Sequence, residues 1–299
     1  MGDRTKIDWC DASWNPVTGC LHGCAYCYAR RIAKRFDGGL ADDDYWRTGE
    51  RIYELEAAVH KTEPCGSDNI LRVGTALAYP FGFEPTFHKH RLDEPKHWKN
   101  PRTIFVCSMA DLFGDWVPDE WIERVFQACI EAPQHHYFFL TKNPKRYERL
   151  HEAGKLSIEG FNGLRSAWYG TSVTKAGDPI FFGDSSVRTF LSIEPIHGSF
   201  KDAGDITSVD WAIIGAETGS RKEKIVPEKK WVTEIAERFH SWDIAVFMKE
   251  SLRGIMGEDF IQEFPKYMNM WRKLEREEGY GNVRNDESSV PDVRSGEGC

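Results

Sequence analysis

Residues 15–35 read NPVTGCLHGCAYCYARRIAKR and contain three cysteines, Cys20, Cys24 and Cys27, in the spacing C-x3-C-x2-C. Three thiols so close together in the sequence predict one shared metal or cluster site. Gly19 and Gly23 lie in the same stretch, and we expect them to permit its tight turns, because glycine adopts positive φ at no steric cost. The stretch therefore predicts a compact loop whose thiols face one small site.

Three kinds of site compete for these thiols. Structural zinc takes four ligands, commonly two C-x2-C pairs or a mixture with histidine, and His22 inside the loop would strain a tetrahedral site. A thioredoxin-type C-x-x-C at a helix start leaves Cys20 without a role. A cubane [4Fe–4S] cluster has four irons, so three thiolates bind three of them and leave the fourth open. The cluster fits the spacing best, and zinc remains the alternative.

The bulk composition is that of a globular protein. The chain has 299 residues, of which 40% are hydrophobic and 29% charged, and its formal net charge is −8. This charge argues against strong non-specific binding to duplex nucleic acid, which depends on neutralising phosphates. No apolar run approaches the roughly 18 residues that cross a bilayer, and the N-terminus has no signal-peptide core. We therefore expect a cytoplasmic protein without a membrane partner.

Short apolar runs alternate with helical patterns along the chain. The runs are apolar on both faces, as is typical of parallel strands covered by helices. Strands are expected at residues 103–108, 136–141, 167–173, 189–195, 210–216 and 244–250, with a short one near 13–19. Helices are expected at residues 118–132, 144–154 and 227–242. This succession predicts an α/β fold, namely a partial (β/α)6 TIM-type barrel.

The barrel is expected to form one domain over residues 1–276. Within it, residues 37–101 form an insertion rich in glycine, proline, histidine and charge. A long segment of this kind is often a substrate wall or lid. Residues 277–299 have almost no apolar side chains, so a flexible tail is expected there.

Polar side chains follow the apolar runs where each predicted strand ends. The carboxyl ends of barrel strands carry the active site, so we expect these groups to share one site. Alternatively, strands simply end where polar loops begin. The groups are Ser108, Asp111, Thr141, Lys142, Thr171, Ser172, Ser192, Glu194, Glu217, Lys249 and Glu250. The two lysines would balance carboxylates in salt bridges or bind an anionic substrate.

The cysteine loop resembles the signature of the radical S-adenosylmethionine superfamily. That signature is C-x3-C-x-aromatic-C, and here it reads Cys20-Leu-His-Gly-Cys24-Ala-Tyr26-Cys27. A closer resemblance, up to about residue 265, is to phage- and bacteria-borne three-cysteine-motif radical proteins, a group without a settled reaction. The stretches that carry it are WNPVTGC, RLDEPKHWKNPRTIFVCSMADLFG, FFLTKNP, SIEP and WAIIGAETG.

The resemblance implies both cofactors and chemistry. Cys20, Cys24 and Cys27 would hold a [4Fe–4S] cluster, and S-adenosylmethionine would bind its open iron. An electron from an external donor of the flavodoxin or ferredoxin type would then cleave S-adenosylmethionine to methionine and a 5′-deoxyadenosyl radical. The barrel core of the superfamily is implied as well.

The resemblance also suggests residues that contact S-adenosylmethionine. The segment 107–111, CSMAD, stands where many relatives have a glycine–glycine–glutamate motif for the methionine amino group. That motif is absent, and Ser108 and Asp111 are the candidates to replace it.

The other cofactor-binding candidates follow the same analogy. Tyr26 would meet the adenine, while Ser172, Ser192 and Glu194 would bind ribose or carboxylate. Glu217 lies in residues 213–219, which resemble a glycine-bearing segment beside the adenine, and with Glu194 it is a candidate contact for substrate or ribose. For each residue the alternative is an ordinary loop hydrogen bond.

The sequence does not determine the substrate. A nucleic acid base or nucleotide is the first candidate, and a small metabolite or a peptide are others. Arg30, Arg31, Lys34 and Arg35 would contact phosphate or form a solvated helix face. A non-catalytic module with structural zinc or a sensing iron–sulfur site is the alternative function, and a nucleic-acid-binding protein without chemistry is a third.

Overall fold

The computed structural model of the chain describes residues 5–41, 52–65, 70–156 and 167–268. The chain divides into two compact units, Met1–Pro265 and Lys266–Cys299. The first unit contains the sheets, the helices and the candidate site. The tail predicted at residues 277–299 lies outside the described residues.

A seven-stranded sheet forms the centre of the first unit, and its neighbouring strands all pair in parallel. The strands stand in chain order: β1 (Ala12–Trp14), β7 (Thr103–Val106), β8 (His136–Thr141), β9 (Ala167–Val173), β10 (Arg188–Ile193), β11 (Trp211–Ile214) and β12 (Val246–Met248). Nearly every residue in them is buried. The prediction of parallel strands covered on both faces is therefore confirmed.

Three helices occupy the segments where helices were expected. They are α3 (Asp119–Ile130), α4 (Pro144–Glu152) and α5 (Lys229–His240). Helix α3 begins after Pro118 with Asp119 and Glu120. Their negative charges interact favourably with the positive end of the helix dipole and stabilise the helix. A short helix, α6 (Arg253–Met256), follows β12. Among the described residues, no helix has both the length and the apolar character needed to span a bilayer.

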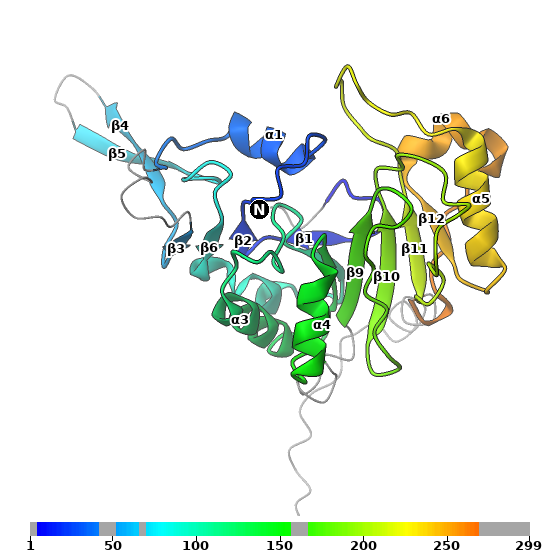
Figure 1. Ribbon diagram of the computed structural model, residues 1–299. Coiled ribbons are helices and arrows are strands. Elements are labelled where there is room, and N and C mark those ends of the chain that lie inside the picture. Colours follow the sequence, from blue (N-terminus) through cyan, green and yellow to red (C-terminus); the bar gives the residue numbers. More distant parts are fainter. Residues whose placement is uncertain (1–4, 42–51, 66–69, 157–166, 269–299) are drawn as a thin grey trace, which may run out of the picture. The chain divides into compact units, whose positions relative to one another are not determined.

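The prediction of a partial (β/α)6 TIM-type barrel is wrong. The sheet curls but stays open, with β1 at one edge and β12 at the other (Figure 1). Residues 174–187 between β9 and β10 contain no helix, and neither do residues 194–210 between β10 and β11. The strict alternation of strand and helix is therefore interrupted. Apolar runs predicted the buried strands correctly, but they do not determine what covers each strand or whether the sheet closes.

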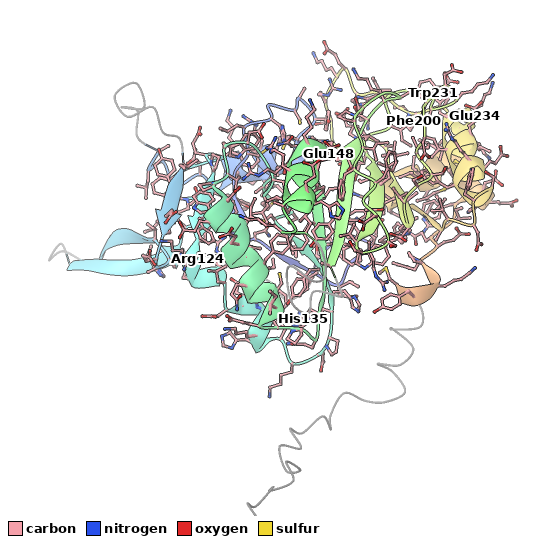
Figure 2. The ribbon with its side chains drawn as sticks, turned by 60° about the horizontal axis from the view of Figure 1, so that its bottom comes forward. Arg124, His135, Glu148, Phe200, Trp231 and Glu234 are labelled. Atoms are coloured by element: carbon pink, nitrogen blue, oxygen red, sulfur yellow. The ribbon has the colours of Figure 1, made fainter. Side chains whose placement is uncertain are left out.

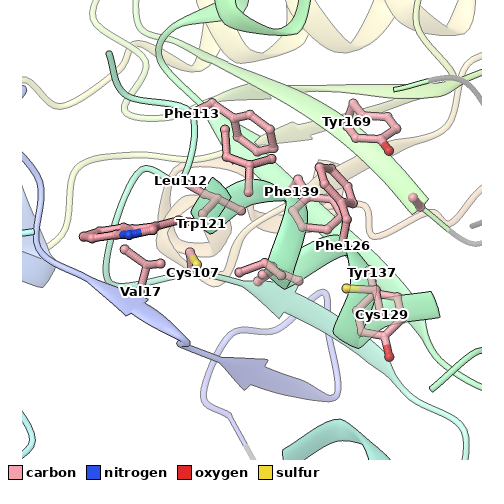
Figure 3. Close-up of a cluster of buried hydrophobic side chains, with 14 of the residues drawn as sticks. Val17, Cys107, Leu112, Phe113, Trp121, Phe126, Cys129, Tyr137, Phe139 and Tyr169 are labelled. Carbon is pink, nitrogen blue, oxygen red and sulfur yellow. The ribbon is translucent and has the colours of Figure 1, made fainter. Parts of the chain in front are cut away.

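The outer face of the sheet packs against the helices through two clusters of buried apolar side chains. In the first cluster, rings of α3 meet rings of the strands, and the centroids of Phe126 and Phe139 lie 4.9 Å apart (Figure 3). In the second cluster, α5 covers β10 to β12, and Phe200 and Trp231 lie together there (Figure 2). Apolar burial thus fixes the helices on this face.

Buried aromatic side chains cover the inner face, and we call five of them, against which Trp168 and Phe247 also pack, the aromatic floor. The centroids of its contacting rings lie between 5.0 and 6.4 Å apart. The floor consists of Trp9, Phe105, Phe138, Phe190 and Trp211. Gly170 makes room for it, because a Cβ atom there would lie 2.2 Å from the Phe190 ring.

The described parts of the predicted insertion at residues 37–101 form two small sheets. One contains β2 (Val17–Thr18), β6 (Thr86–His88) and β3 (Tyr53–Leu55), and the other is the hairpin of β4 (His60–Cys65) and β5 (Ile70–Ala76). The hairpin projects away from the main sheet in Figure 1. Strand β2 directly precedes the cysteine loop, so the first small sheet supports that loop.

Candidate functional site

A cavity of about 890 Å³ opens at the carboxyl ends of the main strands. The cysteine loop, the start of α1 (Tyr28–Arg35) and the loops after the strands line it, and part of the aromatic floor forms its base. Every residue expected to bind the cluster or the cofactor reaches this cavity: Cys20, Cys24, Cys27, Tyr26, Ser108, Asp111, Ser172, Ser192, Glu194 and Glu217. The fold thus brings together groups that are up to about 200 positions apart in the sequence.

Backbone contacts on both sides hold the cysteine loop in place. Gly19 N–H donates to the Met109 carbonyl at 3.0 Å, and Cys20 N–H donates to the Phe83 carbonyl at 3.2 Å. Gly19 has φ +87° and Gly23 has φ +70°, which confirms the expectation that these glycines permit tight turns. At Gly19 a Cβ atom would also lie 2.2 Å from the Glu84 carbonyl oxygen.

The three thiols lie close enough to influence one another's charge. The pKa of Cys20 is raised to about 12, mainly by burial; the charges of Asp111, Cys27 and Cys24 add to this rise, and a hydrogen bond from the His22 backbone opposes it. Burial also raises the pKa of Tyr26, with Cys24 next in effect. Cys27 caps α1, and its Sγ accepts a hydrogen bond from Arg30 N–H at 3.3 Å. The Cys27 sulfur therefore lies at the N-terminus of α1.

The cysteine loop does not form a ready site for a single ion. Within the part of the chain that the structure describes, no three histidine, cysteine, aspartate or glutamate side chains are grouped to hold one metal ion. In particular, the His22 ring bonds to Asp111 rather than joining the thiols. In a cubane cluster each thiolate binds a different iron, so the thiols need not converge on one point.

Asp111 joins three segments around the cavity. Its Oδ1 accepts hydrogen bonds from Phe113 N–H at 3.0 Å and from Thr141 Oγ1 at 2.8 Å. Its Oδ2 lies 2.7 Å from His22 Nε2 and accepts from Lys142 N–H at 2.9 Å. Protein groups therefore engage both oxygens, and the carboxylate ties the cysteine loop to the ends of β7 and β8.

Ser108 is held beside α1 by a residue that the sequence reasoning missed. Asn15 Oδ1 accepts hydrogen bonds from Ser108 Oγ at 3.2 Å and from Met109 N–H at 2.9 Å. The Tyr28 hydroxyl donates to the Ser108 carbonyl at 2.5 Å. In the sequence, Asn15 could have been identified as a site residue by its position, one residue after a strand and five residues before the first cysteine of the loop.

The Tyr26 ring contacts an ammonium and an imidazole. Lys142 Nζ is 5.4 Å from the Tyr26 ring centroid and donates to Ser172 Oγ at 2.6 Å. The His197 ring meets Tyr26 edge-on, with 5.4 Å between centroids. His197 was not among the predicted site residues. These contacts join the cysteine loop to the segments that follow β8 and β10.

Both predicted carboxylates of the later strands accept from cations. Glu194 accepts from Lys249 Nζ with both oxygens, at 2.7 and 2.8 Å. The buried Glu217 accepts from Arg221 Nε and Nη2, each at 2.8 Å. These hydrogen bonds from Arg221 lower the pKa of Glu217. Ser192, also buried, lies beside Ser172 in the register of β9 and β10.

Comparison with known families identifies the chain only at the level of its family. Residues 4–258 match a family model described as a protein of unknown function, DUF5131. The match covers most of the chain, so the chain belongs to this family. No curated protein and no solved structure matches the chain.

Proposed function

We propose that this member of the DUF5131 family is a radical S-adenosylmethionine enzyme whose Cys20, Cys24 and Cys27 hold a [4Fe–4S] cluster. The observation that carries the proposal is that all three thiols line the same cavity as the polar strand ends. Such a cluster, with S-adenosylmethionine on its open iron, supplies one-electron reductive cleavage of the sulfonium C–S bond. The proposal needs a curled parallel sheet with a cavity at its carboxyl ends, and it does not depend on a barrel.

The donor set is compatible with a cluster. Three thiolates in one loop disfavour one another's charge, and irons would relieve that repulsion because thiolates are ligands of iron–sulfur clusters. The cap position of Cys27 adds the positive end of α1 beside the most C-terminal ligand. The three sulfur atoms are therefore suitable ligands for a cationic iron centre.

The other cavity residues would bind and orient S-adenosylmethionine. Tyr26 offers a ring face for adenine, and the hydroxyls of Ser172 and Ser192 face the same space for ribose or carboxylate. Glu194 would contact ribose or substrate through an oxygen shared with Lys249. The aromatic floor excludes water from below the site.

Asp111 has a different role in this proposal. Because its oxygens already accept from four protein groups, we expect it to position the cysteine loop. Ser108 is then the candidate for the methionine amino group at the place of the absent glycine–glycine–glutamate motif.

The electron would come from an external donor of the flavodoxin or ferredoxin type, in the cytoplasm. The first candidate substrate is a nucleic acid base or a nucleotide. The alternative function is a non-catalytic module in which the loop holds zinc or a sensing cluster.

Anaerobic reconstitution tests the proposal. The native chain should bind about four irons and release 5′-deoxyadenosine when S-adenosylmethionine and dithionite are added. A variant with Cys20→Ala, Cys24→Ala and Cys27→Ala should lose both properties. The control Cys10→Ala removes a buried thiol two residues before β1 and should keep them. Retention of iron and product by the triple variant would refute the assignment. One zinc per chain without iron would instead favour the non-catalytic module.

A further inference from the structure

Most of the exposed large apolar side chains lie in two short segments of the chain, one of which lines the cavity. Eight large apolar side chains are exposed in the described part of the chain, and seven of them lie within residues 21–40 or 225–226: Leu21, Tyr28, Ile32, Phe36, Leu40, Ile225 and Val226. Arg31 Nη2 donates to the Thr218 carbonyl at 3.3 Å, so the first segment contacts the loop that leads to Ile225 and Val226. An exposed apolar patch of this kind commonly marks a binding surface.

Three of these side chains form a continuous row on α1, which we call the α1 strip. Tyr28, Ile32 and Phe36 follow one another at intervals of four residues, so they share a side of the helix. Tyr28 and Ile32 also line the cavity. The strip therefore runs from the cavity outward over about 12 Å, the rise of eight helical residues.

Unpaired positive charge borders the strip. Half of the eight residues of α1 are arginine or lysine, and none is acidic. We call Arg31, Lys34, Arg35 and Lys222, which stands four residues after the Thr218 that Arg31 contacts, the cationic rim. No acidic side chain among the residues that the structure describes forms an ion pair with any of these four, whereas Lys89, Arg146 and Lys249 elsewhere all have such partners. Within the described residues, a chain with a net charge of −8 thus has four cations without an acidic ion-pair partner along this segment.

We infer that the α1 strip and the cationic rim bind single-stranded nucleic acid, with bases on the strip, phosphates at the rim and one nucleotide directed into the cavity. Aromatic side chains beside cations are the common means of holding single strands. The strip is one helix wide and matches the height of roughly three to four stacked bases at 3.4 Å each. A folded protein partner commonly needs about 20–30 residues a side, which this narrow surface does not offer.

This inference names the substrate class of the proposed site and rests on the proposed function only for the nucleotide in the cavity. Binding to the strip needs neither cluster nor S-adenosylmethionine. The two ideas can therefore fail separately. An oligonucleotide can bind a chain that releases no 5′-deoxyadenosine, and a chain that releases 5′-deoxyadenosine can fail to bind an oligonucleotide.

Fluorescence anisotropy with a fluorescein-labelled single strand of about 15 nucleotides, and with its duplex, tests the inference. The full-length chain is used as purified and after reconstitution. The single strand should bind more tightly than the duplex in both states. The logarithm of its binding constant should fall with the logarithm of salt concentration by about 0.7 for each phosphate contact.

Matched variants locate the surface. The double change Lys34→Glu and Arg35→Glu should weaken single-strand binding about tenfold or more and reduce the salt slope by about 1.4, for two lost contacts. The control Lys145→Glu with Lys201→Glu changes net charge equally at exposed positions outside the cavity, and it should leave the slope unchanged. Phe36→Ala should weaken binding about tenfold, because base stacking is lost while the side chain is already exposed.

Three results would overturn the inference. They are the absence of single-strand binding, tighter binding of the duplex, and equal weakening by the α1 and control double variants. If a flavodoxin-type acidic protein instead binds in a manner that Lys34→Glu and Arg35→Glu abolish, while oligonucleotides do not bind, the surface serves a protein partner.

Discussion

The inner face of the main sheet has two parts that lie on the same strands. Toward the amino ends lies the aromatic floor, and toward the carboxyl ends lies a polar rim of Lys142, Ser172, Ser192, Glu194, Glu217 and Lys249. On β10, Phe190 belongs to the floor, Ser192 follows two residues later and Glu194 two residues after that. Alternate residues share a face of a strand, so a residue of the buried core, Phe190, and a residue of the candidate site, Ser192, lie next to each other on the same face.

Different interactions hold the two parts. The floor consists of rings that exclude water and need no partners beyond one another, apart from indole N–H groups such as that of Trp211, which donates to the Glu263 carbonyl at 3.0 Å. The rim contains charges and hydroxyls, whose burial is costly unless they are hydrogen-bonded. Floor changes should therefore act mainly on stability, and rim changes mainly on binding.

The largest expected effect is in the floor. Trp211→Ala should lower the free energy of unfolding by about 3–5 kcal/mol, because it removes a fully buried indole and leaves a cavity. Its counterpart in the rim, Ser192→Ala, should change that free energy by about 1 kcal/mol or less. Urea unfolding followed by circular dichroism measures both. A rim change as costly as the floor change would remove the distinction between the two parts.

The cysteine loop offers the next contrast, between two glycines with positive φ. Gly19→Ala should displace the loop, because its Cβ would meet the Glu84 carbonyl, and overpacking of this kind costs about 1–3 kcal/mol. At Gly23 no heavy atom lies within 4 Å of the added Cβ, so only the strain of positive φ remains, about 1–2 kcal/mol.

Iron content after reconstitution distinguishes these two variants further. Gly19→Ala should bind well under half of the iron that the native chain binds, because it moves the first ligand, Cys20. Gly23→Ala should retain most of it. Equal iron content in the two variants would show that the contact with Glu84 does not place the loop.

Asp111 links the rim to the cysteine loop, and its replacement should have an effect on stability similar to that of Gly19→Ala. Asp111→Asn turns one accepting oxygen into a donor, which leaves a buried donor such as Thr141 Oγ1 or Lys142 N–H unsatisfied at a cost of about 1–3 kcal/mol. S-adenosylmethionine binding, measured by equilibrium dialysis, should weaken as the loop loses its tie to β8.

The control for this change is Asp115→Asn, at an exposed carboxylate that pairs with Arg149. Because exposed pairs contribute about 0–1 kcal/mol, this variant should unfold and bind almost like the native chain. Weakened cofactor binding in Asp115→Asn alone would contradict the role assigned to Asp111.

The sequence predicted the strands and the gathering of the site better than the overall architecture. The strands at residues 136–141 and 167–173 were placed correctly, because buried parallel strands have continuous apolar runs. The barrel was wrong because apolar runs carry no information about closure, and the connections after β9 and β10 have no helix.

The gathering of the site followed from a topological rule rather than from local pattern. Parallel strands end at one edge, so the polar groups that follow them meet there. The bonds of Asn15 to Ser108 and of His22 to Asp111 were not foreseen. They join residues about 90 positions apart, and no local pattern in the sequence encodes which polar groups will pair at that separation.

The smallest expected effect concerns the charge of Glu217 in the rim. Arg221 lowers the pKa of this buried carboxyl below its ordinary value of 4.5. A carboxyl whose pKa is lower in the folded than in the unfolded state contributes its full stabilisation above the unfolded value, and loses it as the pH falls toward the folded value. The free energy of unfolding of the native chain should therefore exceed that of Glu217→Gln by a constant amount above about pH 5.5, and the excess should shrink below about pH 4.5. Urea midpoints measured for both proteins across this range give the comparison.

Trp211→Ala provides the contrast from the floor. Its lost burial involves no ionisable group, so its loss in the free energy of unfolding should stay constant over the same pH range. A Glu217→Gln difference that grows on acidification would mean that the carboxyl is held neutral, and that the rim, like the floor, is stabilised without charge.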